Sequence, residues 1–265
     1  MAATRSSAEA REAYDPSFFE NLAAAEDRHF WFRARNRVIG TLAAQLTAGL
    51  PPGFRVLEVG CGTGAVLRAL ERACPRGTVV GMDFFGEGLR HAHRRGSRLV
   101  QADLHAPPFA VGFDLVGLFD VVEHLPDDVG VLSDLARLLA PGGALLVTVP
   151  AGRELWSWYD EAVRHRRRYE PAELAARLGE AGYAVEYLSP YMSPIFPLVW
   201  LRRKLARAGR PPSDAESHAL AEGEFRVVPG LNELLDWCLA PEVRRIARRR
   251  VLPFGTSIVA VARLR

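Results

Sequence analysis

Short apolar runs alternate with helical windows along most of the chain. The apolar runs cover residues 55–59, 78–82, 99–102, 113–118 and 144–149. The helical windows cover residues 65–73, 87–95 and 129–139. Such β-α alternation is typical of a parallel sheet with helices on both faces, so the pattern predicts an α/β fold.

The two ends of the chain extend this pattern differently. Apolar residues recur at three- and four-residue steps through residues 18–50, which predicts a helical N-terminal segment. After a helix at residues 171–181 and a strand at 183–188, a last strand is expected at 257–262.

About 65 residues separate the last two expected strands. Structureless loops longer than about 15 residues are uncommon in compact domains. We therefore expect a largely helical insertion at residues 190–254, over one end of the sheet. The predicted organisation is a helical cap (1–52), a core (53–189 and 255–265) and this insertion.

Composition and charge narrow the class of protein. The 265 residues are 49% hydrophobic and 25% charged, which fits one α/β domain with or without an appendage. The formal net charge is only +3, so a nucleic-acid partner is disfavoured. Three scattered cysteines fit neither a disulfide framework nor a zinc pattern. The polar start and the lack of a long apolar stretch predict a cytoplasmic protein.

The run VLEVGCGTG at residues 56–64 is an apolar strand that turns through three glycines into a helix. Glycines there permit unusual φ angles and let a ligand approach bare backbone. The G-x-G-x-G spacing differs from the dinucleotide G-x-G-x-x-G. It favours a ligand without a pyrophosphate over a nicotinamide cofactor.

Two acids follow this loop. Asp83 ends the second expected strand, where a carboxylate can accept both ribose hydroxyls. Asp103 ends the third, where it can take an adenine amine. The alternative is an ordinary strand-helix turn followed by two helix-capping aspartates.

Five segments together resemble the successive motifs of class I S-adenosylmethionine-dependent methyltransferases. They are VLEVGCGTG, GMDFF, QADLHAPPF, FDLVGLFDVVEHLPD and LLAPGGALLVTVP. The resemblance implies a Rossmann-like seven-stranded sheet of order 3-2-1-4-5-7-6, its last strand antiparallel, with S-adenosylmethionine across the carboxyl ends of the strands. The cofactor residues it implies are Glu58, Gly60, Cys61, Gly62, Gly64, Asp83, Phe84, Asp103, Leu104 and Phe119.

A segment before the core adds to the resemblance. HFWFRARNR at residues 29–37 is similar to an N-terminal helix that covers the cofactor in a bacterial subset of the family. We expect Trp31 to cover the cofactor and Arg35, in preference to Arg33, to pair with its carboxylate. The alternative is an amphipathic helix with packed aromatic residues and solvated arginines.

Two histidines are candidates for the chemistry. His165 follows the fifth strand, and its segment is similar to small-molecule methyltransferases related to ubiquinone-type O-methyltransferases. An imidazole with a pKa near 6.5 can serve there as a general base. His124 is a second candidate in the family's E-H step, or a structural histidine. His165 itself could instead belong to a solvated basic face.

No metal is predicted, because His91 and His93 would point in different directions from a helix. The predicted function is S-adenosylmethionine-dependent methylation of a small molecule. Methylation of an oxygen is favoured over methylation of a nitrogen or a carbon, because a histidine base suits a hydroxyl.

The sequence does not decide what the basic insertion at residues 190–254 contacts. Arginine pairs beside apolar residues at 200–205 and 244–250 are the composition of a lid over the acceptor, of a surface that meets anionic lipid, or of a dimer contact. Alternatives to a free small-molecule acceptor are therefore a lipid-linked or cell-envelope substrate at the membrane surface, or a macromolecule. The sequence does not define an oligomeric state.

Overall fold

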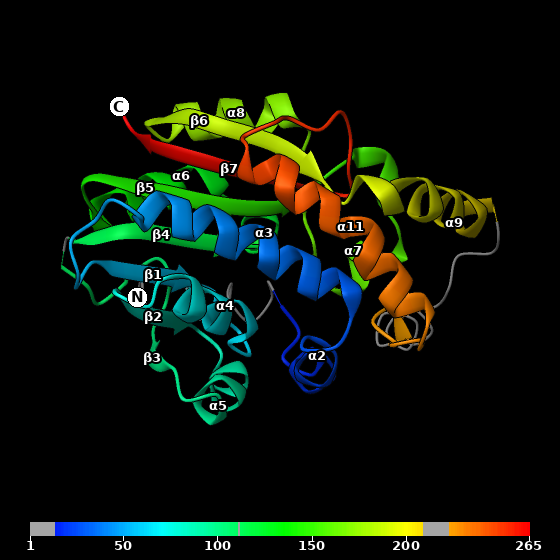
Figure 1. Cartoon of the computed structure of the whole chain (residues 1–265), viewed down its shortest axis with the longest axis horizontal. Coiled ribbons are helices and arrows are strands. Elements are labelled where there is room, and N and C mark those ends of the chain that lie inside the picture. The colour runs from blue at the N-terminus through cyan, green and yellow to red at the C-terminus, as the bar shows by residue number, and fades with distance from the viewer. Residues whose placement is uncertain (1–13, 111, 209–222) are drawn as a thin grey trace.

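The computed structural model contains one seven-stranded sheet of order β3-β2-β1-β4-β5-β7-β6 (Figure 1). It describes residues 14–110, 112–208 and 223–265. The strands are β1 (Arg55–Val59), β2 (Thr78–Asp83), β3 (Arg98–Gln101), β4 (Phe113–Phe119), β5 (Leu139–Pro150), β6 (Tyr183–Tyr191) and β7 (Ser257–Leu264). The predicted start at residues 1–13 and the part of the predicted insertion at 209–222 lie outside the described residues.

The strand directions agree with the family expectation. Strands β1 to β5 pair in parallel, whereas β7 lies antiparallel between β5 and β6. The predicted sheet order and the antiparallel last strand are therefore confirmed. Because parallel strands end at one edge, the chain segments that follow β1, β2, β4 and β5 meet there.

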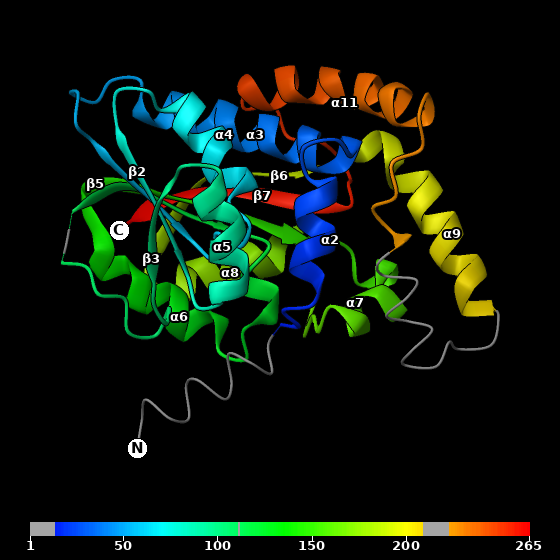
Figure 2. The same cartoon turned by 90° about the horizontal axis from the view of Figure 1, so that it is seen from below.

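Helices cover both faces of the sheet (Figure 2). The α-helices are α2 (Phe18–Ala25), α3 (Phe30–Thr47), α4 (Ala65–Ala73), α5 (Gly86–Arg94), α6 (Asp128–Leu135), α7 (Trp158–Ala162), α8 (Pro171–Glu180), α9 (Phe196–Ala208) and α11 (Leu231–Ala247). The 3₁₀ turns among the described residues are η1 (Val122–His124), η2 (Ala136–Leu138), η3 (Arg153–Leu155) and η4 (Ser193–Ile195). Helices α3, α4 and α11 lie on one face and α6 and α8 on the other.

The core alternates along the strands as a two-sided sheet requires. Val56 of β1 packs into the hydrophobic cluster under α3 and α4, and its neighbour Leu57 packs into the cluster under α6 and α8. Successive strand side chains point to opposite faces. Both faces of the sheet are thus buried, which explains why its strands read as continuous apolar runs.

The helical segment expected at residues 18–50 is divided into α2 and α3. His29 has an extended backbone (φ −71°, ψ 134°), and its side chain accepts a hydrogen bond from the Trp31 amide at the start of α3. The corner lets α2 leave the axis of α3, so that Glu26 reaches the Thr63 hydroxyl beside β1. This interaction between distant segments is not visible in the helical periodicity.

The described part of the insertion contains η4, α9 and α11 together with non-helical residues such as 248–254, and α11 runs beside α3 (Figure 1). The Asn232 side chain accepts from the Phe30 amide at 2.8 Å, and Asp236 pairs with Arg33 and Arg37. Leu239 of α11 is buried in the same cluster as α3. Most of α11 therefore covers a helix of the cap rather than the end of the sheet. None of the described helices is long and apolar enough to cross a membrane.

Candidate active site

A cavity of about 1100 Å³ opens at the carboxyl ends of the strands. It is lined by the segments after β1, β2, β4 and β5, by α2 and α3, and by the described part of the insertion. Among the residues predicted for the site, those that line it are Trp31, Arg35, Glu58, Gly60, Cys61, Gly62, Asp83, Phe84, Asp103, Leu104, Phe119, His124 and His165. Gly64 is the exception.

The glycine loop depends on backbone conformations that other residues rarely adopt. Gly60, Gly62 and Gly64 have φ angles of +76°, +49° and +80°. A Cβ atom on Gly60 would lie 2.5 Å from a methyl group of Val121, and one on Gly64 would lie 2.8 Å from the Ala92 Cβ. Gly64 therefore serves the packing of α4 against α5, while Gly60 and Gly62 face the cavity.

Asp83 both supports the loop and faces the cavity. One carboxylate oxygen accepts from the Gly62 amide at 2.7 Å, and the other accepts from the Phe85 amide at 2.8 Å. Burial raises the pKa of Asp83 despite these amides. A carboxylate oxygen can accept a second hydrogen bond, so Asp83 keeps acceptor positions for ligand hydroxyls. Asp103 is half-buried and accepts from the His105 amide at 2.9 Å.

Two more buried acids lie near the loop. Glu58 is 2% exposed, burial raises the pKa of its carboxyl group, and its Oε2 has no hydrogen-bond partner among the described residues. Glu26 accepts from Thr63 and lies 3.6 Å from an Arg95 nitrogen. The sequence pattern assigns Glu26 no role, because its place in the cavity depends on the corner between α2 and α3.

Arg35 lines the cavity, and its guanidinium group already contacts a carboxylate and an aromatic ring of the protein. Its guanidinium lies 2.6 Å from an Asp120 oxygen and 5.0 Å from the centre of the Trp31 ring. Arg33 instead pairs with Asp236 and is not among the lining residues. Of the two arginines, Arg35 is thus the one with access to a bound ligand, although Asp120 competes for it.

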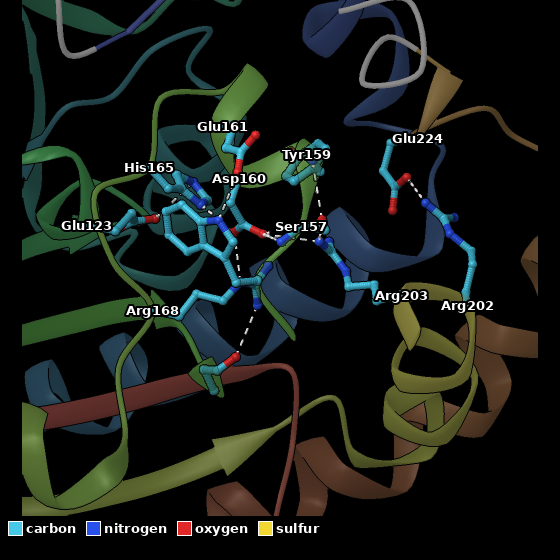
Figure 3. Close-up of polar contacts among 12 residues, drawn as sticks. Glu123, Ser157, Tyr159, Asp160, Glu161, His165, Arg168, Arg202, Arg203 and Glu224 are labelled. Carbon is cyan, nitrogen blue, oxygen red and sulfur yellow. Dashed lines mark hydrogen bonds and ion pairs between the residues drawn. The ribbon is translucent and has the colours of Figure 1, made fainter. Parts of the chain in front are cut away.

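His165 is held by a buried carboxylate (Figure 3). Its Nδ1 lies 2.9 Å from Asp160 Oδ1, and its Nε2 lies 3.8 Å from Glu123 Oε1. Burial lowers the pKa of His165, although Asp160 opposes the shift, so the ring is neutral at pH 7. Asp160 is fixed in turn by a capping box with Ser157 at the start of α7.

His124 joins this group from the segment after β4. Its ring centre lies 4.8 Å from that of His165. Ligand atoms of Glu123, His124 and His165 all lie within 4.8 Å of one another, and both Glu123 oxygens lack hydrogen-bond partners among the described residues. The three side chains form a set that can hold a metal ion. The sequence analysis does not predict it, because His165 is distant in the chain from the adjacent Glu123 and His124.

Two buried arginines share Asp160 with His165 (Figure 3). Arg168 Nε lies 2.7 Å from Asp160 Oδ1, and Arg203 Nη1 lies 3.1 Å from Asp160 Oδ2. Burial alone would raise the pKa of Asp160, but His165 and the two arginines hold it below its usual range. Within the basic runs of the sequence, nothing distinguishes these buried arginines from solvated ones.

Comparisons with known proteins find a family and relatives that match this chain. The family described as "Methyltransferase domain" matches residues 24–188. The chain is 36% identical over 149 residues to a trans-aconitate 2-methyltransferase of Azoarcus sp., covering 56% of each chain. It is 30% identical over 158 residues to a ubiquinone biosynthesis O-methyltransferase of Thiobacillus denitrificans, covering 52% of this chain and 67% of that one.

A solved structure shows the same fold. An S-adenosylmethionine-dependent methyltransferase from Clostridium acetobutylicum superimposes with a TM-score of 0.53 at 12% identity, covering 86% of this chain and 91% of that chain. At this identity the likeness concerns the fold alone. The matched region spans 56% of the length of the Azoarcus relative.

Proposed function

The chain belongs to the S-adenosylmethionine-dependent methyltransferases, and on that premise we propose that it methylates a hydroxyl group of a small-molecule acceptor. The observation that carries this proposal is the His165–Asp160 pair beside the cavity. A neutral imidazole oriented by a buried carboxylate is suited to taking a proton from a hydroxyl. The name of the Thiobacillus relative, an O-methyltransferase, supports the same reaction class.

The residues around the glycine loop fit S-adenosylmethionine. Gly60 and Gly62 offer bare backbone, Asp83 would accept from the ribose hydroxyls, and Asp103 with Leu104 would frame the adenine. Glu58 Oε2 is buried without a hydrogen-bond partner among the described residues. That oxygen would accept from the ammonium group of the cofactor, which explains an otherwise costly buried acid.

His165 would manage the proton of the acceptor. When bound, S-adenosylmethionine supplies a methyl group from its sulfonium; transfer forms a C–O bond to the acceptor, leaves S-adenosylhomocysteine and releases the hydroxyl proton. His165 Nδ1 donates to Asp160, so Nε2 is the nitrogen that receives this proton. Asp160 stays ionised because its pKa is held low, and it stabilises the imidazolium that results.

A second candidate is an acceptor that resides in a lipid layer. Large apolar side chains are exposed on α9 and α11, where Leu198 is 57% exposed and Trp237 is 74% exposed. Leu198 also lines the cavity. Binding of the protein to vesicles of anionic phospholipid, measured by flotation, would favour this candidate; absence of binding would favour a free small molecule.

The proposal is tested by removing His165. With tritiated S-adenosylmethionine and a panel of phenols, hydroxy acids and matched amines, His165→Ala should lower the methylation rate about 100- to 10,000-fold, the usual contribution of a general base. Affinity for S-adenosylmethionine should stay within about twofold, because the base acts on the acceptor. His93→Ala is the control, since His93 is exposed on α5.

Two outcomes would contradict the proposal. Methylation of the amines with none of the hydroxyl compounds would reject the acceptor class, and an unchanged rate in a folded His165→Ala protein would reject the base. Treatment with a chelator distinguishes a role of His165 as a base from a role as a metal ligand. Activity lost with EDTA and restored by a divalent cation would assign Glu123, His124 and His165 to a metal instead.

A further inference from the structure

The part of the cavity formed after β5 is rich in arginine. Among the described lining residues beyond Pro150, the charged side chains are Arg168, Arg202, Arg203, Arg226 and Glu224. Arg202 and Glu224 pair with each other (Figure 3). Arg168 and Arg203, which lie nearest to His165, are therefore not paired with Glu224 and need another carboxylate partner.

Asp160 is the carboxylate that Arg168 and Arg203 share. Arg168 is 6% exposed and Arg203 is 7% exposed, and each contacts a different oxygen of Asp160. One buried carboxylate thus serves two buried guanidinium groups. A buried cation without a matching anion is costly to a folded protein.

Arg203 has hydrogen-bonding capacity left over. Its Nη1 donates to Ser157 and Asp160, and its guanidinium lies 5.6 Å from the centre of the Tyr159 ring. The Nε group is buried and has no hydrogen-bond partner among the described residues. The side chain also lines the cavity, so a ligand can supply the missing acceptor.

We propose that Arg203, together with Arg168, binds an acidic group of the methyl acceptor, which is a carboxylate or phosphate carried on an apolar body. A guanidinium group recognises either anion through charge-assisted hydrogen bonds. This proposal rests on the proposed methyl transfer, whose acceptor it specifies.

The arrangement also says where the acidic group lies on the acceptor. His165 and Arg203 both contact Asp160, so the reacting hydroxyl and the acidic group belong to the same end of the acceptor. The apolar body extends toward a wall of the insertion made by Ile195, Leu198, Val199, Phe225, Leu231 and Leu235. The cavity volume of about 1100 Å³ exceeds the range of about 300–1,000 Å³ for a typical ligand pocket, which leaves space for this body beside the cofactor.

Binding of non-reacting probes tests the anion subsite without depending on methyl transfer. Decanoate and octyl phosphate are the acidic probes, and decanamide is the neutral match for decanoate. In the presence of S-adenosylhomocysteine, calorimetry should show at least about tenfold tighter binding of one acidic probe than of decanamide, as expected for a charge-assisted contact. Which acid binds tighter distinguishes a carboxylate from a phosphate.

Variants of α9 assign the effect to Arg203. Arg203→Met should abolish the preference for the acid, Arg203→Lys should retain part of it, and Lys204→Met should leave it unchanged. Lys204 is the adjacent, exposed cation of the same helix. Thermal unfolding checks that each variant is folded, and Arg203→Lys and Arg203→Gln serve if Arg203→Met does not fold.

Equal affinities for acids and amide, or a preference that survives in folded Arg203 variants, would overturn the subsite. A preference that depends on Arg203 without any methylation of hydroxy acids would uphold the subsite and reject the proposed reaction. The two proposals can therefore fail separately.

Discussion

The two ends of the cavity carry opposite charge. The described segments around β1, β2 and β3 contribute Glu58, Asp83 and Asp103 to its lining, with no lysine or arginine, whereas those beyond β5 contribute four arginines and one glutamate. A sulfonium cofactor is cationic, so the acidic end suits it, and the basic end suits an anionic acceptor. The charge of the lining therefore favours the cofactor at one end of the cavity and the acceptor at the other.

The same contrast appears in two buried acids. Burial raises the pKa of Glu58 at the acidic end, whereas His165 and two arginines hold the pKa of Asp160 low at the basic end. The two carboxyl groups are 2% and 0% exposed. Since burial is alike, the neighbouring charges give the two pKa shifts their opposite directions.

Replacing the acid at the basic end should have the largest effect. Asp160→Asn leaves Arg168 and Arg203 buried without their carboxylate, so we expect a loss of about 3–5 kcal/mol in the free energy of unfolding. Urea denaturation at pH 7 measures it. The contribution of Asp160 is present above its unfolded pKa of about 3.9 and is lost as the pH falls through its lower folded pKa.

Glu58→Gln is the matched change at the acidic end. Because the pKa of Glu58 is higher in the folded state than in the unfolded state, this carboxyl group destabilises the fold at pH values above its unfolded pKa. Glu58→Gln should therefore leave the free energy of unfolding within about 1 kcal/mol of the wild type, or increase it as the pH rises. Equal losses of stability in Asp160→Asn and Glu58→Gln would show that the two ends of the cavity do not differ in charge balance.

The next effect concerns the cofactor. Asp83→Ala should weaken binding of S-adenosylmethionine about 10- to 100-fold, because two ribose hydroxyls lose their acceptor. Calorimetry with S-adenosylmethionine and S-adenosylhomocysteine measures this change. Asp134→Ala, an exposed change on α6, is the control. Unchanged affinity in a folded Asp83→Ala protein would remove Asp83 from the site.

The smallest effect is the pH dependence of the wild-type rate. His165 must be unprotonated to act as a base, and burial lowers its pKa from the reference of about 6.5. The methylation rate should therefore rise with pH through a pKa below 6.5 and stay level between pH 7 and 8. A rate that still rises tenfold per pH unit above pH 7 would show that another group is the base.

The sequence predicts the acidic end better than the basic end. Gly60, Gly62 and Asp83 belong to one strand-loop-helix unit and its neighbour, so their order along the chain carries their geometry. Arg203 meets Asp160 only when the insertion folds onto α7, and the sequence shows a basic run in which burial is invisible. Sheet order followed from the family resemblance. The corner between α2 and α3 depends on contacts with distant segments, which periodicity cannot show.

The position of β7 has a consequence for synthesis of the chain on the ribosome. The 65 residues between Tyr191 and Ser257 separate β6 from the strand that joins it to the sheet. At about 5–20 residues per second, their translation takes roughly 3–13 s. During that interval β7 is absent, so one edge of β5 and both edges of β6 are unpaired, and other chains can join them. The unpaired strand edges of the nascent chain at this stage are therefore the ones that a chaperone would have to shield.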